Sequence, residues 1–260
     1  MTRVAVSGAA GKVGREVVAA VAAAPDLELV GLCDLGPIPE ETAPEVVADC
    51  RGRELDRVLA ESGAAVVVDF TNAAAGPDHL LAAAAAGVCP VVGTTGFSDQ
   101  QVSALGAAVA AAGIGGFLAP NFAIGAVLQM QMCQLAARHF DTVEVIELHH
   151  DQKIDAPSGT ALATARRIAE AAGGGTRDVG TEKFAVEGVR GGNVDGVKVH
   201  SVRLPGLVAH QEVIFGGTGQ TLTLRHDSIS RESFMPGVLL AVRRVQSLNG
   251  LVIGLENLLD

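Results

Sequence analysis

Short apolar runs alternate with helical patterns through the first half of the chain, and this alternation restricts the fold more than any other feature. Five runs have the near-continuous apolarity of buried strands, at residues 3–8, 27–34, 64–71, 89–95 and 115–121. Helical patterns lie between them, at 12–24, 53–62, 77–86 and 99–112. Strands that are apolar on both faces are typical of a parallel sheet covered by helices on both sides. The alternation therefore predicts a doubly wound α/β domain.

The character of the sequence changes near residue 122. A long helical pattern leads into a strand at 142–149, a helix from about 157 to 172 and a glycine-rich loop. Three strand-like segments follow at 196–204, 208–215 and 220–227, and the tail has the pattern of an amphipathic helix. We interpret the middle of the chain as an α+β domain on a mixed sheet, at 124–232, inserted into a first domain formed by 1–123 and 233–260.

Composition argues against nucleic acid and membrane as partners. The formal net charge of −10 disfavours a phosphate backbone, and aromatics at 3%, without Trp or Tyr, disfavour base stacking. The most apolar run is interrupted by Gly87 and Pro90, well short of a bilayer span. The four cysteines show no metal-ligand spacing and are expected to be free thiols in a reducing compartment. We expect a soluble cytoplasmic protein.

The first predicted strand ends in three glycines, Gly8, Gly11 and Gly14, spaced three residues apart and followed by a helix. Glycines let the backbone approach a pyrophosphate, and a helix N-terminus offers it free N–H groups. Asp34 ends the second strand, where a carboxylate can accept hydrogen bonds from an adenosine ribose. The spacing is GxxGxxG rather than GxGxxG, so an ordinary tight turn and a solvated carboxylate are the alternatives. With this context, the sequence predicts a Rossmann-type dinucleotide site.

The residues that follow Asp34 bear on the choice of cofactor. They are Leu35 and Gly36, so a 2′-phosphate would meet a carboxylate without an adjacent guanidinium. Lys12 is the nearest candidate for a compensating charge. We therefore expect that NADH and NADPH are both used, with NADH at least as good.

The segment ELHHDQKIDAPSGTA, residues 147–161, concentrates polar chemistry in an otherwise apolar chain. Its second half predicts a helix start, with Asp155 or Ser158 as the cap and Pro157 near the first turn. The exposed amides of Gly159 and Thr160 would form a cradle for a carboxylate. Lys153 would add positive charge to the same place. An ordinary capped helix with a surface lysine is the alternative interpretation.

His149 and His150 end the strand before this helix. Neighbouring residues on a strand face opposite ways, so we expect no metal site there. Histidine can donate a proton near neutral pH, and these residues lie close in sequence to Lys153 and the helix start. The segment therefore predicts a site for proton transfer to an anionic ligand.

The same segment resembles the signature of the 4-hydroxy-tetrahydrodipicolinate reductase (dihydrodipicolinate reductase) family, enzymes of bacterial lysine and diaminopimelate synthesis. Further similarity lies in VSGAAGKVG, VVGTTGF, APNFAIG, LVAHQEVIFG and LTLRHDS, so the resemblance covers essentially the whole chain. It is closest to actinobacterial forms. Ala10 is a departure, because some actinobacterial members carry lysine there.

The resemblance implies reduction of a small cyclic dicarboxylate, with His149 as general acid and Lys153 as second proton donor and carboxylate binder. It also implies a homotetramer. The substrate-binding residues would be His150, Lys153, Ser158, Gly159 and Thr160. The cofactor-binding residues would be Gly8, Ala9, Ala10, Gly11, Lys12, Val13, Asp34, Gly93, Thr94, Thr95, Ala119, Pro120, Asn121 and Phe122. Closure on the ligand would hinge near 122–124 and 231–234.

Other functions stay open on the sequence alone. A phosphorylating semialdehyde dehydrogenase would need a nucleophilic cysteine, but Cys133 lies mid-helix among apolar residues. The Glu-Lys-Pro signature of sugar and inositol oxidoreductases is missing. A reductase of a related cyclic imine in secondary metabolism and a non-catalytic nicotinamide-binding module both remain compatible with the residues.

Overall fold

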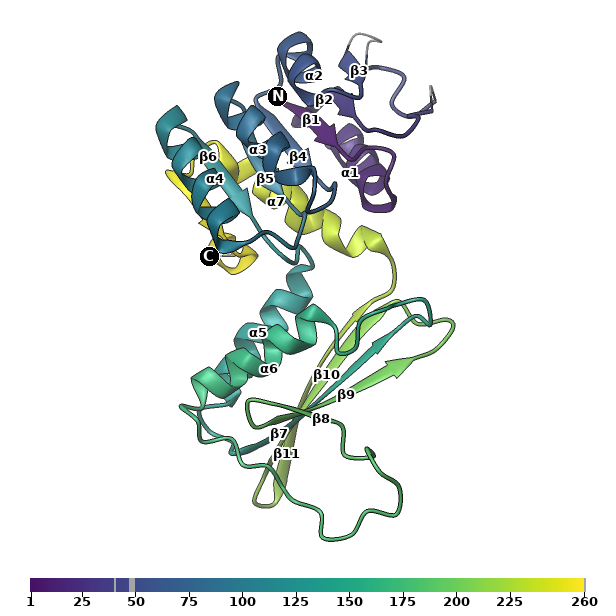
Figure 1. Cartoon of the computed structure of the whole chain (residues 1–260), viewed down its shortest axis with the longest axis vertical. Coiled ribbons are helices and arrows are strands. Elements are labelled where there is room, and N and C mark those ends of the chain that lie inside the picture. Colours follow the sequence, from purple (N-terminus) through teal and green to yellow (C-terminus); the bar gives the residue numbers. More distant parts are fainter. Residues whose placement is uncertain (40, 47–49, 260) are drawn as a thin grey trace. The chain divides into compact units, whose positions relative to one another are not determined.

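The computed structural model describes residues 1–39, 41–46 and 50–259, which form two compact units (Figure 1). The first unit consists of Met1–Phe122 and Phe234–Asp260, and the second of Ala123–Ser233. The chain thus leaves the first unit once and returns to it.

The first unit is built on a seven-stranded sheet whose order is β12-β6-β5-β4-β1-β2-β3. Every neighbouring pair is parallel, as a doubly wound domain requires. The order reverses between β1 and β4, and ligands of such folds bind at the carboxyl ends of the strands beside this point. The strands are β1 Thr2–Ser7, β2 Leu27–Cys33, β3 Arg51–Gly52, β4 Val66–Asp69, β5 Cys89–Val92, β6 Gly115–Leu118 and β12 Gly250–Ile253.

Helices cover both faces of this sheet (Figure 1). In α2, Leu55, Val58 and Leu59 recur at helical spacing, so one side of the helix is buried against Ala5, Val30 and Val67 of the sheet. The helices are α1 Lys12–Ala23, α2 Leu55–Ser62, α3 Gly76–Ala85, α4 Asp99–Ala112 and α7 Met235–Val245, and a short 3₁₀ helix, η3 Leu255–Leu258, follows β12.

The second unit is a five-stranded mixed sheet in the order β11-β10-β7-β9-β8. The pair β7 and β9 is parallel, and the other pairs are antiparallel. Its strands are β7 Thr142–His149, β8 Gly192–Val194, β9 Val197–Arg203, β10 Ala209–Gly217 and β11 Gln220–Ser228. Its helices are α5 Ile124–Ala136 and α6 Gly159–Ala171, and η2 Arg231–Phe234 leads back to α7. The fold is therefore the predicted α/β domain with an inserted mixed-sheet domain.

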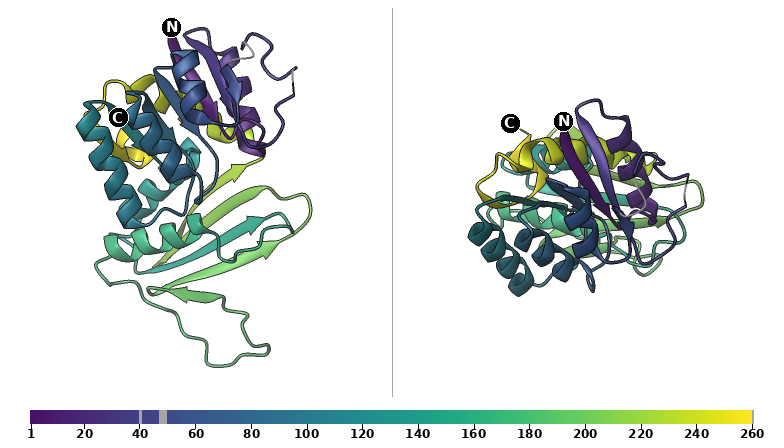
Figure 2. Two further views of the ribbon diagram at one scale, coloured as in Figure 1. Left: turned by 45° about the horizontal axis from the view of Figure 1, so that its top comes forward. Right: turned by 90° about the horizontal axis from the view of Figure 1, so that it is seen from above.

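The helices α5 and α6 pack on one face of the second sheet (Figure 2). Alternate residues of the strands, among them Val145, Val213 and Phe215, are fully buried with Ile168 of α6. On the opposite face, side chains such as Ile146, Leu148, Val202 and Ile214 are only half-buried. This face keeps an apolar centre that α5 and α6 do not cover.

Every helix among the described residues falls short of the length and apolar character that a transmembrane span needs.

Candidate active site

The glycine loop after β1 is a tight turn in which two glycines are sterically required. Gly8 has φ +82°, and a Cβ there would lie 2.6 Å from the Phe70 carbonyl oxygen. A Cβ on Gly14 would lie 1.9 Å from the carbonyl oxygen of Gly8. Gly11 N donates to Gly8 O (3.0 Å), and Gly11 is the N-cap residue of α1, which therefore has no side-chain cap. The first amides of α1 are thus left for an anionic ligand.

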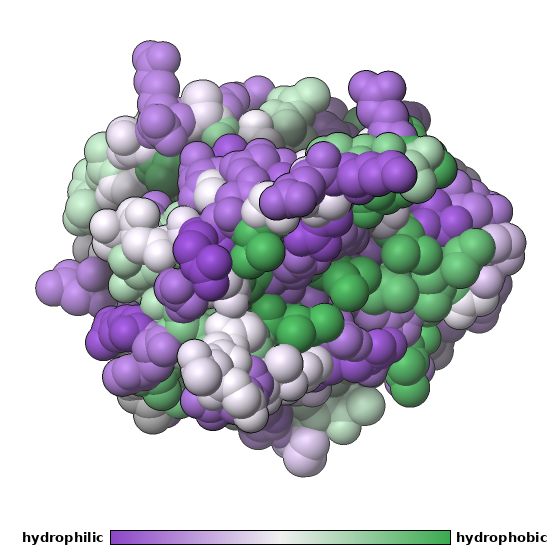
Figure 3. Space-filling model, turned by 90° about the horizontal axis from the view of Figure 1, so that it is seen from below, coloured by the Kyte–Doolittle hydropathy of each residue, from purple (hydrophilic) through white to green (hydrophobic). Residues whose placement is uncertain are grey.

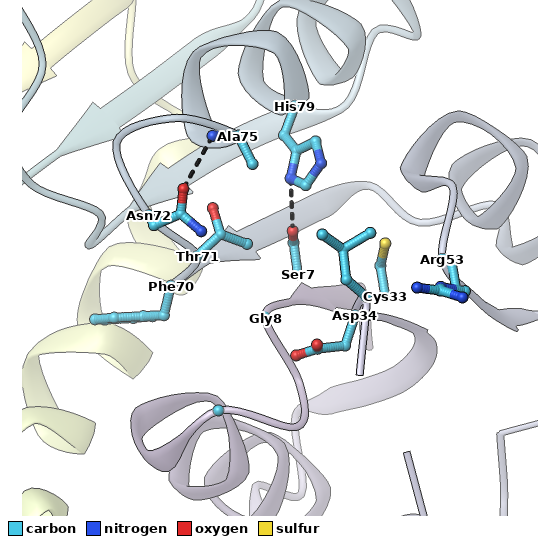
Figure 4. A pocket seen from close by; sticks show the side chains of 12 residues that line it. Ser7, Gly8, Cys33, Asp34, Arg53, Phe70, Thr71, Asn72, Ala75 and His79 are labelled. Atoms are coloured by element: carbon cyan, nitrogen blue, oxygen red, sulfur yellow. Dashed lines mark hydrogen bonds between the residues drawn. The ribbon is translucent and has the colours of Figure 1, made fainter. Parts of the chain in front are cut away.

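Asp34 lies at the end of β2 and is tied to this loop. Its Oδ2 accepts from Ala10 N (2.9 Å) and its Oδ1 from Gly36 N (2.8 Å). Asp34 lines a cavity of about 230 Å³ whose wall is formed by residues from the ends of β1, β2 and β4 (Figure 4). This is the switch point of the sheet. The glycine cradle, the unpaired helix amides and the strand-end carboxylate together fit a dinucleotide.

Arg53 lies beside Asp34, which the sequence analysis did not anticipate. The short strand β3 pairs with β2 so that Gly52 lies opposite Cys33, and Asp34 N donates to Gly52 O (3.0 Å). Arg53 follows Gly52 and Asp34 follows Cys33, so these two residues are neighbours as well. Both line the cavity (Figure 4). No arginine follows Asp34 directly in the sequence, as expected. The expectation that Asp34 has no neighbouring arginine is nevertheless wrong, because strand pairing places Arg53 next to it.

A buried carboxylate connects the loops at this edge of the first sheet. Asp69 at the end of β4 is 0% exposed and accepts from Thr94 Oγ1 (2.6 Å) and Thr71 Oγ1 (2.9 Å). His79 Nδ1 lies 3.4 Å from Asp69 Oδ2 and 3.1 Å from Ser7 Oγ. The hydrogen bond to Asp69 raises the pKa of His79 above its ordinary value. Asp69 therefore connects the segments that follow β4 and β5, and His79 extends this network to Ser7 of β1.

The remaining predicted cofactor residues, at 93–95 and 119–122, follow β5 and β6 at the same edge. They do not line the cavity around Asp34. A Cβ on Gly93 would lie 2.1 Å from Phe70 Cε1. The ring centroids of Phe122 and Phe70 are 5.6 Å apart. Phe70 therefore lies between the loops that line the Asp34 cavity and the loops that follow β5 and β6.

The second unit contains the predicted substrate residues. Helix α6 begins at Gly159 with Ser158 as its cap, since Ser158 Oγ accepts from Ala161 N (3.1 Å). Of the two caps considered, Ser158 is thus the actual one, and Pro157 directly precedes it, next to the first turn. A Cβ on Gly159 would meet nothing within 4 Å, so the start of α6 is open to a ligand.

Lys153 and Asp155 lie in the turn between β7 and α6. Lys153 Nζ contacts Asp155 Oδ1 at 2.7 Å, and this hydrogen bond lowers the pKa of the Asp155 carboxyl. The Asp155 side chain is 58% exposed, so it can release the ammonium group at small cost when an anionic ligand binds. His150 follows the strand, and its carbonyl accepts from Lys153 N (3.2 Å).

His149 is the last residue of β7, and its Nδ1 is hydrogen-bonded to Glu147 Oε2. Its side chain is 14% exposed. Burial lowers the pKa of His149, as do the charges of Lys153 and Arg203, while Glu147 acts in the opposite direction. Within residues 1–39, 41–46 and 50–259, no three His, Cys, Asp or Glu side chains are grouped to hold a metal ion.

Glu147 and Arg203 were missed by the sequence analysis. Glu147 follows Val143 and Val145 at the strand period of two, so its position on the buried face was readable from the pattern. A carboxylate on a buried face is uncommon unless it is paired, and this was the available signal. Arg203, its partner, comes from β9 and could not be paired with it before the register was known.

Two family models match the chain. Residues 2–122 match the model described as "Dihydrodipicolinate reductase, N-terminus", and residues 125–259 match "Dihydrodipicolinate reductase, C-terminus". Together they span nearly the whole chain.

Individual proteins are similar over the same length. The 4-hydroxy-tetrahydrodipicolinate reductase of Desulfitobacterium hafniense (strain DSM 10664 / DCB-2) is 49% identical, covering 99% of this chain and 98% of that protein. That of Synechocystis sp. (strain ATCC 27184 / PCC 6803 / Kazusa) is 49% identical, with 98% and 97% covered. The structure of dipicolinate-bound dihydrodipicolinate reductase from Paenisporosarcina sp. TG-14 matches with TM-score 0.89 and 43% identity over 100% of both chains.

More distant structures share the fold alone. Apo scyllo-inositol dehydrogenase from Lactobacillus casei has a TM-score of 0.65 at 11% identity, covering 99% of this chain and 93% of that one.

Proposed function

The chain belongs to the dihydrodipicolinate reductase family, and from this premise we propose which of its residues perform each part of the reaction. The activity is the NAD(P)H-dependent reduction of 4-hydroxy-tetrahydrodipicolinate, via dihydrodipicolinate, to tetrahydrodipicolinate in lysine and diaminopimelate biosynthesis. The observation that carries the residue assignments is the grouping of His149, Lys153 and the open start of α6 in one unit.

The first unit binds the cofactor in this proposal. Residues Gly8 to Val13 hold the pyrophosphate, Asp34 accepts from the adenosine ribose, and residues 93–95 and 119–122 hold the nicotinamide end. Support comes from the steric requirement for Gly8 and Gly14 and from the two amides that orient Asp34. The bound reduced nicotinamide supplies a hydride.

The second unit binds the substrate. The two carboxylates of the substrate need positive partners, which Lys153 and the amides of Gly159 and Thr160 supply. His150 and Ser158 complete the site. Each charge-assisted hydrogen bond contributes about 1.5–3 kcal/mol. His149 donates a proton to the ring nitrogen, on which negative charge accumulates as hydride adds. The lowered pKa makes the protonated ring a stronger acid but also reduces the fraction that is protonated at neutral pH, so turnover should fall as the pH rises through the pKa of His149.

A coupled assay tests the function directly. The substrate is formed in place by condensing pyruvate with aspartate semialdehyde, and oxidation of the reduced cofactor is followed at 340 nm. Oxidation that requires the fresh substrate is expected, and binding of the cofactor without turnover would indicate a non-catalytic module. Faster turnover of another cyclic imine carboxylate in the same assay would support the secondary-metabolism alternative.

The phosphorylating dehydrogenase alternative conflicts with the state of Cys133. The residue is 0% exposed, and burial raises the pKa of its thiol to about 12. A thiol in that state supplies almost no thiolate nucleophile at neutral pH.

We propose that both NADH and NADPH are used, with NADH at least as good. Asp34 favours a free ribose hydroxyl, and Arg53 beside it offers a guanidinium to a 2′-phosphate. The ratio of catalytic efficiencies for the two cofactors tests this preference, and a strong bias toward NADPH would contradict it.

Replacing Arg53 with glutamine should raise KM for NADPH about tenfold and leave KM for NADH nearly unchanged. The reason is that only NADPH carries the phosphate that forms a charge-assisted hydrogen bond, worth about 1.5–3 kcal/mol. Steady-state kinetics with each cofactor measures the effect. Arg57→Gln on the exposed side of α2 is the matched control, since Arg57 does not line the cavity. Equal changes for both cofactors would rule out a phosphate-specific role for Arg53.

We also propose that the protein is a homotetramer assembled through the second unit. Its sheet has a face with an apolar centre that α5 and α6 leave uncovered, and the edge strands β8 and β11 are open to pairing. In the view from below, hydrophobic side chains lie at the surface between hydrophilic ones (Figure 3). Exposed apolar residues of this unit include Val179, Phe184, Val186, Val189 and Leu222.

Light scattering coupled to size exclusion should give four times the chain mass of 26.4 kDa. The expected cause is burial of the apolar sheet face, which removes hydrophobic surface from water. A mass of one chain at micromolar concentration would contradict the assembly, and a mass of two chains would limit it to a dimer.

A cytoplasmic location is proposed from the thiols. Cys33, Cys50, Cys89 and Cys133 are all free and buried, which suits a reducing compartment.

A further inference from the structure

A carboxylate is fully buried on the same strand as the proposed proton donor, two residues before it. Glu147 is 0% exposed and lies on the helix-covered face of β7. A buried ionised carboxyl is unfavourable unless hydrogen bonds and opposite charge compensate it. Burial raises the pKa of Glu147, but hydrogen bonds from Arg203, Ser201 and His149 outweigh it and lower the pKa below its ordinary value. Glu147 is therefore ionised inside the second unit.

Arg203 supplies most of this compensation. Its Nη1 donates to Glu147 Oε2 (2.9 Å) and its Nη2 to Glu147 Oε1 (2.8 Å), which is a bidentate pair. Arg203 Nη2 also donates to the carbonyl oxygen of Asp155 (2.6 Å). Arg203 lies opposite His149 in the parallel register of β7 and β9. The pair is thus fixed both to the strand that ends in His149 and to the turn that carries Lys153.

The ring of His149 has one nitrogen committed to this pair. Its Nδ1 contacts Glu147 Oε2, and Glu147 Oε1 also accepts from Ser158 N (3.3 Å) at the cap of α6. An ionised carboxylate can only accept, so Nδ1 must carry a hydrogen. Nε2 is then the nitrogen left for the substrate.

We propose that Glu147 and Arg203 are positioning residues that hold His149 in the Nδ1–H form and present Nε2 as the proton-donating atom. The inference rests on the proposed role of His149 as proton donor. In the donating step the Nε2–H bond breaks and the new N–H bond forms on the substrate. His149 is left neutral with hydrogen on Nδ1, and Glu147 remains a carboxylate throughout.

Arg203 has a second consequence, for the acidity of the ring. The charged groups that face His149 are Glu147 from its own strand, Arg203 from β9, and Lys153 with its partner Asp155 from the following turn. Glu147 alone would hold the imidazolium strongly, which would weaken it as an acid. Because Arg203 already balances Glu147, the protonated ring is held less firmly and releases its proton more easily.

The tautomer can be measured in the unmodified protein. Long-range ¹H–¹⁵N spectra of ¹⁵N-histidine protein distinguish Nδ1–H from Nε2–H, and the His149→Gln spectrum identifies the signals of His149 among the seven histidines. We expect hydrogen on Nδ1 of the neutral ring and a pKa below the ordinary 6.5. Hydrogen on Nε2 with a bare Nδ1 would overturn the proposal, and this measurement does not depend on any variant folding.

The variant Arg203→Gln tests the charge balance. The pKa of His149 should rise relative to that in the unmodified protein, because a positive charge that lowers it is removed, and the pH above which turnover falls should move upward with it. A merely structural role would reduce turnover without moving either titration. The control is Arg190→Gln, because Arg190 pairs with Glu144, which also contacts His200, in a similar group on the same sheet.

The outcomes separate this inference from the function on which it rests. An unmoved His149 titration in Arg203→Gln would contradict the positioning role and leave His149 free to be the acid. Undiminished turnover in His149→Gln would instead remove the proton donor itself, whatever the spectra show.

Discussion

Replacing His149 with glutamine should lower the turnover number at least tenfold, with a modest change in KM for the dicarboxylate. Glutamine keeps a polar side chain in the site but cannot donate a proton as an acid. Proton transfer from a positioned group typically contributes about 100- to 10,000-fold to a rate. Because binding of the two carboxylates is assigned to other residues, the loss should appear in the turnover number rather than in KM. Initial rates at saturating cofactor measure both quantities.

The matched control for this experiment is His139→Gln. His139 is exposed in the connection between α5 and β7, outside the proposed site. Its replacement should leave both constants within twofold of the unmodified enzyme, because the side chain lies outside the site and isolated surface substitutions change the free energy of unfolding by only about 0.5 kcal/mol. Turnover by His149→Gln equal to that of this control would exclude His149 as the acid.

Replacing Gly14 with alanine should weaken cofactor binding about 5- to 150-fold. The added Cβ would lie 1.9 Å from the carbonyl oxygen of Gly8 and 2.7 Å from its carbonyl carbon, and neither can move without changing the loop. Overpacking of this kind costs about 1–3 kcal/mol, and each 1.4 kcal/mol is a tenfold change in affinity. Quenching of the fluorescence of NADH on titration with protein, or calorimetry, gives the dissociation constant.

Gly106→Ala in α4 is the control for this substitution. The nearest atom to its Cβ would be Leu251 Cδ2 at 3.8 Å, an ordinary contact, and alanine favours a helix interior over glycine. Its cofactor affinity should match that of the unmodified protein. Tight binding by Gly14→Ala would show that the loop after β1 does not cradle the pyrophosphate.

The predicted core of the fold followed from residues whose burial leaves a pattern in the sequence. The strands β1, β2, β4, β5 and β6 read as apolar runs because both of their faces are covered. The strands β3, β8 and β12 were not predicted. They have two to four residues and lie at the edges of their sheets, where a short segment carries too little periodicity to be recognised.

The parts of the site formed by residues close in sequence were predictable. The parts formed by residues that strand pairing brings together from distant segments were not. Gly14 and Ser158 act on atoms a few residues away, so their spacing was informative, whereas the close contact that Gly8 avoids is with Phe70 on another strand end. Arg53 reaches Asp34 only because β3 pairs with β2, and Arg203 reaches Glu147 only through the register of β9 with β7. Such neighbours are set by strand pairing between distant segments, which no local pattern encodes.

The division of the chain has a consequence for synthesis on the ribosome. The first unit needs α7 and β12, which lie beyond the whole of the second unit in the sequence. The segment 123–233 therefore emerges and can collapse while the parallel sheet still lacks the strand that covers β6. Until β12 emerges, β6 is an exposed hydrogen-bonding edge, and nascent chains should be most prone to aggregation at that stage.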